Sequence, residues 1–135
     1  MIRLKGAVTS GNGVGKKYVS MPVYNGILTN ILKAKPFEGT LNIVLNNLCV
    51  EELISRCAPN IVNDISFEGN TYGGFYYWNC RIINERKGIS EDVIVLRPFR
   101  TRNPKNVVEL ISSKYLRERL MLEDGDAVLL EFLCG

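Results

Sequence analysis

The spacing of apolar residues along this chain predicts short strands more often than helices. In most segments apolar residues alternate with polar ones or form brief β-branched runs. Positions two apart share one face of a strand, so such segments indicate extended structure. The pattern predicts strands over residues 2–9, 17–21, 40–45, 65–68, 71–84, 89–97, 107–111 and 127–133.

Helical spacing occurs in fewer places. Ile27, Leu28, Ile31 and Leu32 recur on one helical face, which predicts a helix over 23–34 that ends before Pro36. Shorter helices are predicted over 50–57, for one turn opened by Asn103 and Pro104, and from a Ser113 cap to about residue 121.

Turn signals separate these elements without any regular alternation of strand and helix. A glycine-rich loop covers 10–16, Gly69-Asn70 and Gly88 divide the central strands, and 123–126 forms a further turn. This order argues against a Rossmann or P-loop sheet and favours a mainly β fold, a small closed barrel. At 135 residues the chain makes one domain spanning 1–135.

Composition excludes several kinds of chemistry. The chain has no histidine, which rules out Ser-His-Asp and Cys-His triads, histidine-ligated zinc and a histidine general base. No C-x-x-C pair, secretory leader or membrane-length apolar run is present. We therefore expect a cytoplasmic protein with no membrane partner, in which all the cysteines are reduced thiols: Cys49, Cys57, Cys80 and Cys134.

The charge is small but unevenly distributed. Seventeen basic and 14 acidic residues give a net charge of +3, too little to imply a nucleic-acid partner. Residues 1–40 carry six basic and one acidic residue, and residues 81–120 carry ten and five. Two distant basic segments could therefore converge on one anionic ligand.

Glycines at alternate positions precede two lysines in the first loop. Gly11, Gly13 and Gly15 allow positive φ and can present successive N–H groups to one oxyanion, and Lys16 adds a positive charge. The loop lacks the first glycine and the Ser/Thr of a Walker A motif. The predicted strand after it also argues against a dinucleotide fingerprint. A flexible hairpin loop with solvated lysines would have the same composition.

Thr40 and Asn42 are two apart in a predicted strand and therefore point to one face, opposite Leu41 and Ile43. A hydroxyl and a carboxamide oxygen side by side can supply neutral ligands to Mg²⁺, which often shares its shell with substrate phosphates. Two ordinary polar residues on a half-exposed strand would give the same pattern.

These two segments, GNGVGKKYVSMPVY and LKAKPFEGTLNIVL, resemble the archaeal CTP-dependent riboflavin kinases. A third segment, LRPFRTRNPKNVVELISSKYLRERLMLEDGDAV, is similar to the C-terminal signature of that family. Its basic stretch carries a threonine, a glutamate follows eight residues later, and L-R-E then leads to a D-G-D turn. The resemblance runs from about Gly6 to Glu131.

The resemblance implies a six-stranded cradle-loop β-barrel with a few short helices, which transfers the γ-phosphoryl group of CTP to the ribityl 5′-hydroxyl of riboflavin. The products would be FMN and CDP, and Mg²⁺ the cofactor. Carried over residue by residue, the resemblance assigns the nucleotide to Gly11, Asn12, Gly13, Val14, Gly15, Lys16, Lys114, Tyr115, Leu116 and Arg117, the magnesium ion to Thr40 and Asn42, and the flavin to Thr101 and Glu109.

Two departures concern specificity more than the reaction. Asn103 stands where the family pattern has a histidine, and Ser112-Ser113 replaces an Ala-Pro pair. Lys16 is a candidate for stabilising the phosphates, and no general base can be named.

Two further segments keep open interpretations. A basic run without acidic residues is expected either to be solvated or to place one cation against a phosphate; it consists of Arg97, Arg100, Arg102 and Lys105. The aromatic run 75–78 is better explained by core packing than by flavin stacking. We expect a monomer that binds no nucleic acid. The alternatives to the kinase are a non-catalytic DNA-binding barrel and a flavin-binding barrel without turnover.

Overall fold

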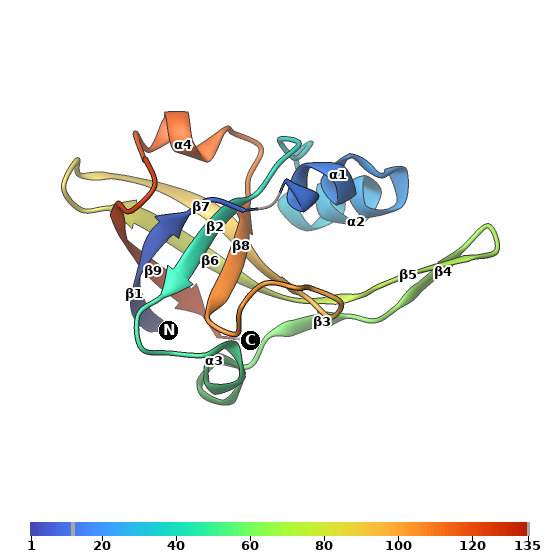
Figure 1. Cartoon of the computed structure of the whole chain (residues 1–135). Helices are drawn as coiled ribbons and strands as arrows, with labels where there is room; N and C mark the ends of the chain where they lie inside the picture. Colours follow the sequence, from blue (N-terminus) through green and yellow to red (C-terminus); the bar gives the residue numbers. More distant parts are fainter. Residues whose placement is uncertain (12, 135) are drawn as a thin grey trace.

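A closed antiparallel β-barrel forms the body of the molecule (Figure 1). The computed structural model describes residues 1–11 and 13–134. The barrel runs in the order β6-β7-β8-β2-β1-β9, and pairing of β9 with β6 closes it. Its strands are β1 (Ile2–Thr9), β2 (Leu41–Leu45), β6 (Phe75–Asn84), β7 (Ile89–Pro98), β8 (Val107–Ile111) and β9 (Ala127–Leu133). The predicted mainly β, six-stranded barrel is confirmed.

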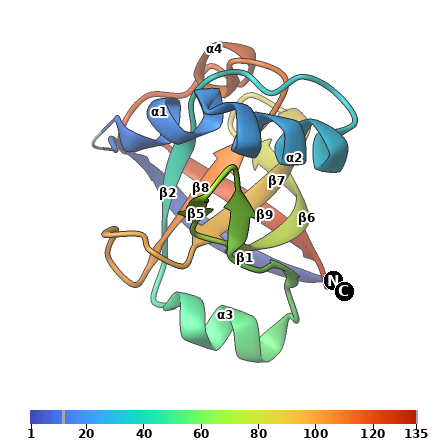
Figure 2. The same cartoon turned by 90° about the vertical axis from the view of Figure 1, so that its right-hand side faces the viewer.

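Short elements surround the barrel. Strand β3 (Asn60–Val62) pairs with β6, and β4 (Ile65–Phe67) pairs with β5 (Asn70–Tyr72) in a hairpin that projects from the barrel (Figure 1). Helices α1 (Val14–Ser20) and α2 (Pro22–Leu32) lie together on one side, while α3 (Val50–Arg56) lies at the opposite end of the view from α4 (Leu116–Arg119) (Figures 1 and 2). In the described residues, no helix is long and apolar enough to cross a membrane.

Alternation along β2 separates the barrel interior from the site. Leu41, Ile43 and Leu45 belong to the main core, whereas Asn42 lies between them on the opposite face. Trp78 and Phe132 fill the same interior and meet edge to face, with ring centroids 5.9 Å apart. The predicted division of this strand into an apolar and a polar face is therefore confirmed.

A second apolar cluster joins the helices to the outside of the barrel. On β7, Val95 faces the interior while Ile94 and Leu96 pack with Val19 of α1 and Leu28 of α2. Strand β7 is therefore buried on both faces, which explains its nearly continuous apolar sequence. Through this cluster the barrel fixes the position of α1.

The local structure after the glycine loop differs from the prediction. Residues 17–21 were expected to be extended, but α1 occupies 14–20. Val19 is fully buried in the second cluster, so packing outweighs the modest strand preference of Tyr18 and Val19. The argument from a following strand against a dinucleotide fingerprint therefore no longer holds. The fingerprint G-x-G-x-x-G would, however, need its third glycine at position 16, and the third glycine here is Gly15.

Two other predicted helix starts have different outcomes. Pro104 opens one hydrogen-bonded turn, in which the Val107 backbone N–H donates to the Pro104 carbonyl at 3.1 Å, but this turn is not part of a helix. The predicted cap at Ser113 is wrong, because α4 begins after Tyr115 with no side-chain cap. The hydroxyl of Ser112 instead accepts a hydrogen bond from the backbone N–H of Lys114 at 3.1 Å, which stabilises a turn before the helix.

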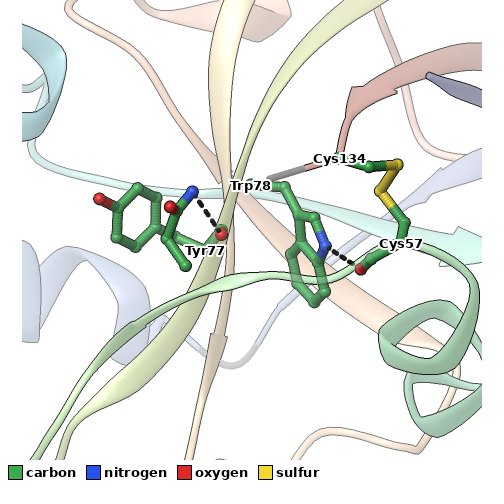
Figure 3. Close-up of a disulfide and its surroundings, with 5 residues drawn as sticks. Cys57, Tyr77, Trp78 and Cys134 are labelled. Atoms are coloured by element: carbon green, nitrogen blue, oxygen red, sulfur yellow. Dashed lines mark hydrogen bonds between the residues drawn. A yellow bond between two sulfur atoms is a disulfide. The ribbon is translucent and has the colours of Figure 1, made fainter.

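The prediction that all cysteines are reduced is wrong for one pair. Cys57, at the end of α3, forms a disulfide with Cys134, just after β9, across 77 positions of sequence (Figure 3). The Trp78 indole N–H donates to the Cys57 carbonyl at 2.8 Å and holds this end of α3 against the barrel. Tertiary structure alone brings the two cysteines together, so their spacing gave no signal. Cys49 and Cys80 are free thiols.

Candidate active site

Three polar side chains meet on the outer face of β2 and β8, beneath α1. Asn42 and Glu109 are direct partners across the two strands, and Thr40 lies immediately before β2. The Thr40 hydroxyl oxygen is 3.2 Å from Asn42 Oδ1 and 3.2 Å from Glu109 Oε1. Asn42 and Glu109 are both buried. The strands thus place three oxygen-bearing groups from two distant segments at one point.

The glycine loop packs directly on this cluster. A Cβ atom at Gly11 would lie 2.5 Å from Asn42 Nδ2, and one at Gly15 would lie 2.9 Å from Thr40 Cγ2, so neither position has room for a side chain. Gly13 has φ +81°, a left-handed conformation that glycine adopts without strain. The alternate glycines are therefore explained by close approach at two positions and by backbone conformation at the third.

A first cavity of about 560 Å³ opens between the glycine loop and the segment before α4. Two of its lining residues, Ser10 and Arg117, donate hydrogen bonds to Asp124, the latter at 2.7 Å. These two contacts hold the pKa of the Asp124 carboxyl below its usual value, the Ser10 contact contributing most. The lining residues include Ser10, Gly11, Gly13, Gly15, Lys16, Phe37, Thr40, Asn42, Glu109, Ser112, Lys114, Tyr115, Leu116 and Arg117.

The first cavity is lined by three cations, Lys16, Lys114 and Arg117, and by two carboxylates, Glu38 and Glu109. Lys114 pairs with Glu91 at 3.1 Å, but Lys16 makes no ion pair within the described part of the chain. At one end Phe37 and Tyr115 stack with ring centroids 4.8 Å apart. The cavity therefore combines exposed backbone, a free ammonium group and an aromatic rim, which suits a polyanion that carries a planar ring.

A second cavity of about 530 Å³ lies between α1, α2, the base of the β4–β5 hairpin and the loop after β7. It is lined by Val14, Tyr18, Met21, Tyr24, Thr71, Tyr72, Gly73, Gly74, Phe75, Leu96, Pro98, Arg100, Thr101, Arg102, Asn103 and Glu109. Its walls are more aromatic than those of the first cavity. Glu109 is the one described residue that lines both cavities, so the two spaces meet at its carboxylate.

The loop after β7 carries Thr101 to the second cavity. The Arg97 guanidinium holds this loop by donating to the carbonyls of Pro104 at 2.9 Å and Val107 at 2.8 Å. Asn103, at the position of the expected histidine, donates its backbone N–H to the Thr101 hydroxyl at 3.1 Å. Arg97 is thus half-buried, and its guanidinium is bonded to the backbone of this loop. Its pKa lies below the ordinary value because of burial, an effect that the Glu109 charge opposes.

The buried aromatic residues of β6 pack in the core, as predicted. Phe75 and Trp78 are buried on opposite faces of the strand, Trp78 in the barrel interior and Phe75 in the second cluster. Phe75 also forms part of the wall of the second cavity, so core packing and site formation coincide there.

Burial dominates the protonation behaviour of Glu109. It raises the pKa of this carboxyl above the usual value, while hydrogen bonds from Thr40 and Tyr18 and the nearby Arg97 charge oppose the rise. Burial also raises the pKa of the Tyr18 phenol, and the negative charge of Glu109 raises it further. Tyr18 is therefore a hydrogen-bond donor over the physiological pH range.

The oxygen atoms around Thr40 fit a small divalent cation. Neighbouring ligands in an octahedral Mg²⁺ shell, with bonds of about 2.1 Å, lie about 3 Å apart. The separation between Thr40 Oγ1 and Asn42 Oδ1, 3.2 Å, is close to that value. No cluster of three or more His, Cys, Asp or Glu side chains suited to a metal occurs in the described residues.

Most of the residues that the family resemblance assigns to substrates lie around the two cavities. Gly11, Gly13, Gly15 and Lys16 line the first cavity together with the segment 114–117, and Thr101 and Glu109 line the second. Val14, which the resemblance assigns to the nucleotide, lines the second cavity instead of the first. Asn12 lies outside the described residues.

Sequence reasoning missed Tyr18 and the pair Tyr24 and Tyr72. Tyr18 is three positions after Gly15, which places both on one face of a helix. That signal was lost because the segment was predicted to be a strand. Tyr24 and Tyr72 come together only through the packing of α2 against the hairpin, with ring centroids 5.9 Å apart.

Comparison with known proteins decides the family. The model of the CTP-dependent riboflavin kinases, described as domain of unknown function DUF120, matches residues 8–132. This chain belongs to that family. The enzyme is 39% identical to the riboflavin kinase of Sulfurisphaera tokodaii over 133 residues, covering 97% of this chain and 95% of the relative.

Two other relatives agree. The chain is 35% identical to the riboflavin kinase of Saccharolobus solfataricus over 133 residues, with 96% of this chain and 73% of the relative covered. It is 34% identical to the riboflavin kinase of Methanococcus aeolicus over 123 residues, with 91% and 92% covered. All three relatives are named riboflavin kinase, so the chain belongs to a family of enzymes.

Proposed function

We propose that the enzyme transfers the γ-phosphoryl group of CTP to the 5′-hydroxyl of riboflavin and releases FMN and CDP. The observation that supports this best is the meeting of two cavities at Glu109, one lined by a glycine loop and cations and the other by aromatic side chains. A transfer reaction needs its two substrates in contact at one point, and two cavities that share one lining residue provide such a point.

The first cavity is proposed as the CTP site. The backbone N–H groups of Gly13 and Gly15 and the ammonium of Lys16 would bind the β- and γ-phosphates. Residues 114–117 would complete the site beside the Phe37 and Tyr115 rings. This assignment places the phosphates next to Thr40 and the base toward the aromatic rim.

Thr40 and Asn42 are proposed to hold Mg²⁺ through their side-chain oxygens. A magnesium ion bound there would neutralise charge on the phosphates of CTP during transfer. The protein holds both side chains in place. Asn42 is buried where β2 pairs with β8, Gly11 packs against Asn42, and Gly15 packs against Thr40.

The second cavity is proposed as the riboflavin site. Thr101 and Glu109 would contact the flavin, with the ribityl chain leading toward the first cavity. The 5′-hydroxyl oxygen would then form a bond to the γ-phosphorus as the bond from that phosphorus to the bridging oxygen of CDP breaks. Phosphoryl transfer of this kind depends on positioning and charge neutralisation, which suits a chain without histidine.

The test is to incubate the purified chain with riboflavin, Mg²⁺ and one nucleoside triphosphate at a time, and to follow FMN by chromatography. We expect FMN with CTP, dependent on Mg²⁺. Absence of FMN with every donor would overturn the proposal. Riboflavin binding without FMN would instead support a flavin-binding barrel without turnover, and salt-sensitive DNA retention without flavin binding would support the DNA-binding alternative.

A further inference from the structure

The hydroxyl of Tyr18 lies at the point where the two cavities meet. It donates a hydrogen bond to Glu109 Oε1 at 3.3 Å, and the same carboxylate oxygen is 3.2 Å from the Thr40 hydroxyl. Thr40 lines the first cavity and Tyr18 lines the second. Glu109 is thus held by one donor from each substrate side.

The tyrosine is held firmly in this position. Its ring packs edge to face against Tyr24, with centroids 5.7 Å apart, and the neighbouring Val19 is fully buried. Its helix is fixed against the site a second time where Gly15, on the same helical face, meets Thr40. The Tyr18 hydroxyl can therefore fix the orientation of the Glu109 carboxylate.

Among the described residues, Glu109 accepts side-chain hydrogen bonds on its carboxylate from two donors and lies near the Arg97 charge. Its side-chain hydrogen bonds come from Thr40 and Tyr18, and both reach the same oxygen, Oε1. Since the Thr40 hydroxyl is also within 3.2 Å of Asn42 Oδ1, it cannot give its single proton fully to Glu109. The phenol is therefore the donor that this carboxylate does not have to share.

We propose that Tyr18 is a positioning residue for phosphoryl transfer. Its hydroxyl holds the Glu109 carboxylate between the two cavities, so that Glu109 can align the ribityl end of the flavin with the phosphates bound under the glycine loop. Because Tyr18 and the loop glycines belong to one continuous segment, the same segment orders both substrate sites. This inference rests on the function proposed above.

The variant Tyr18→Phe removes the hydroxyl and keeps the ring. Tyr77→Phe is the matched control, since Tyr77 packs against the same apolar cluster but lines neither cavity. We expect Tyr18→Phe to lower kcat/KM for riboflavin by about tenfold, the equivalent of one hydrogen bond to a charged group. CDP affinity, measured by calorimetry, should change by less than about twofold, because Tyr18 does not line the first cavity. Tyr77→Phe should leave both values unchanged.

A double-mutant cycle with Glu109→Ala tests whether Tyr18 acts through Glu109, because alanine removes the acceptor of the Tyr18 hydrogen bond. If Tyr18 acts through Glu109, Tyr18→Phe has little further effect on kcat/KM in the Glu109→Ala background. An equal loss in both backgrounds would overturn the inference, because it would show an independent contact or a packing defect. Wild-type kinetics in Tyr18→Phe would overturn it as well. Both results require a wild-type enzyme that forms FMN, so they are distinct from failure of the proposed function.

Discussion

At the scale of single residues, the site depends on the close approach of the glycine-loop backbone to the side chains of Thr40 and Asn42. Thr40 and Asn42 could be recognised from their spacing alone, because a strand places them on one face. The need for glycine at position 15 could not, since the adjacent Thr40 is 25 positions away in the sequence and meets it only in the folded barrel. The two substitutions below separate ligand chemistry from close packing.

The double variant Thr40→Ala/Asn42→Ala removes both proposed magnesium ligands. We expect turnover to fall by about 100-fold or more, since charge on the transferring group loses its counter-charge. Riboflavin affinity should change little, because neither residue lines the second cavity. Asn46→Ala, an exposed amide just beyond the other end of β2, is the control. Retained activity with wild-type magnesium dependence would refute the ligand assignment.

Gly15→Ala should disrupt the site through sterics alone. The new methyl group would meet the Thr40 side chain, its Cγ2 at 2.9 Å, so α1 must move away from β2 or Thr40 must rotate. We expect loss of FMN formation and of CDP binding, measured by chromatography and calorimetry. Gly26→Ala in α2 is the control, since a Cβ there meets nothing within 4 Å. It should stabilise the fold by about 0.5–1 kcal/mol and preserve activity.

At the scale of elements, loops that look solvated are held by specific groups. The basic run that begins at Arg97 in β7 was expected to be exposed or to reach a phosphate. The Arg97 guanidinium instead donates to backbone carbonyls and holds the loop that carries Thr101. Helix α1 shows the same limit of sequence reasoning, because its burial against β7 and not its own propensity makes it helical. Strand β7 could be predicted locally, whereas the helix α1 and the loop position of Thr101 required the tertiary fold.

Arg97→Met tests this role of the loop. Loss of the guanidinium removes its hydrogen bonds to the Pro104 and Val107 carbonyls, although the Pro104 carbonyl keeps the Val107 backbone N–H as a donor. We expect the free energy of unfolding to fall by about 2 kcal/mol and riboflavin to bind more weakly. Arg81→Met, which breaks an exposed ion pair with Asp92, should cost less than about 1 kcal/mol. Equal effects of the two substitutions on riboflavin binding, measured by titration of flavin fluorescence, would contradict the loop assignment.

At the scale of the whole molecule, the barrel brings three distant segments to one junction. The pattern of strands and turns already favoured a small closed barrel, and the family resemblance supplied the number of six strands. The disulfide could not be predicted, because Cys57 and Cys134 are neighbours only once α3 lies beside the end of β9. That cross-link joins the periphery of the barrel to its last strand, away from the residues that line either cavity.

Removing the cross-link should affect stability more than activity. Closing a chain segment of 77 positions lowers the entropy of the unfolded state, worth about 4 kcal/mol in the chain-entropy model. Cys57→Ser/Cys134→Ser should lower the free energy of unfolding by about that amount and leave KM for riboflavin unchanged. Cys49→Ser, which removes a free thiol, is the control. Equal stability of the two variants in urea titrations would show that the bond does not form in solution.

The central claim is that nucleotide and flavin occupy two cavities that meet at Glu109. A crystal structure of the enzyme with CDP, Mg²⁺ and FMN tests it most directly. We predict that the CDP phosphates lie between Gly13 and Thr40, that the isoalloxazine ring lies beside Thr101, and that the FMN phosphate points toward Glu109. Either ligand bound outside its assigned cavity, or an FMN phosphate directed away from Thr40, would contradict the account.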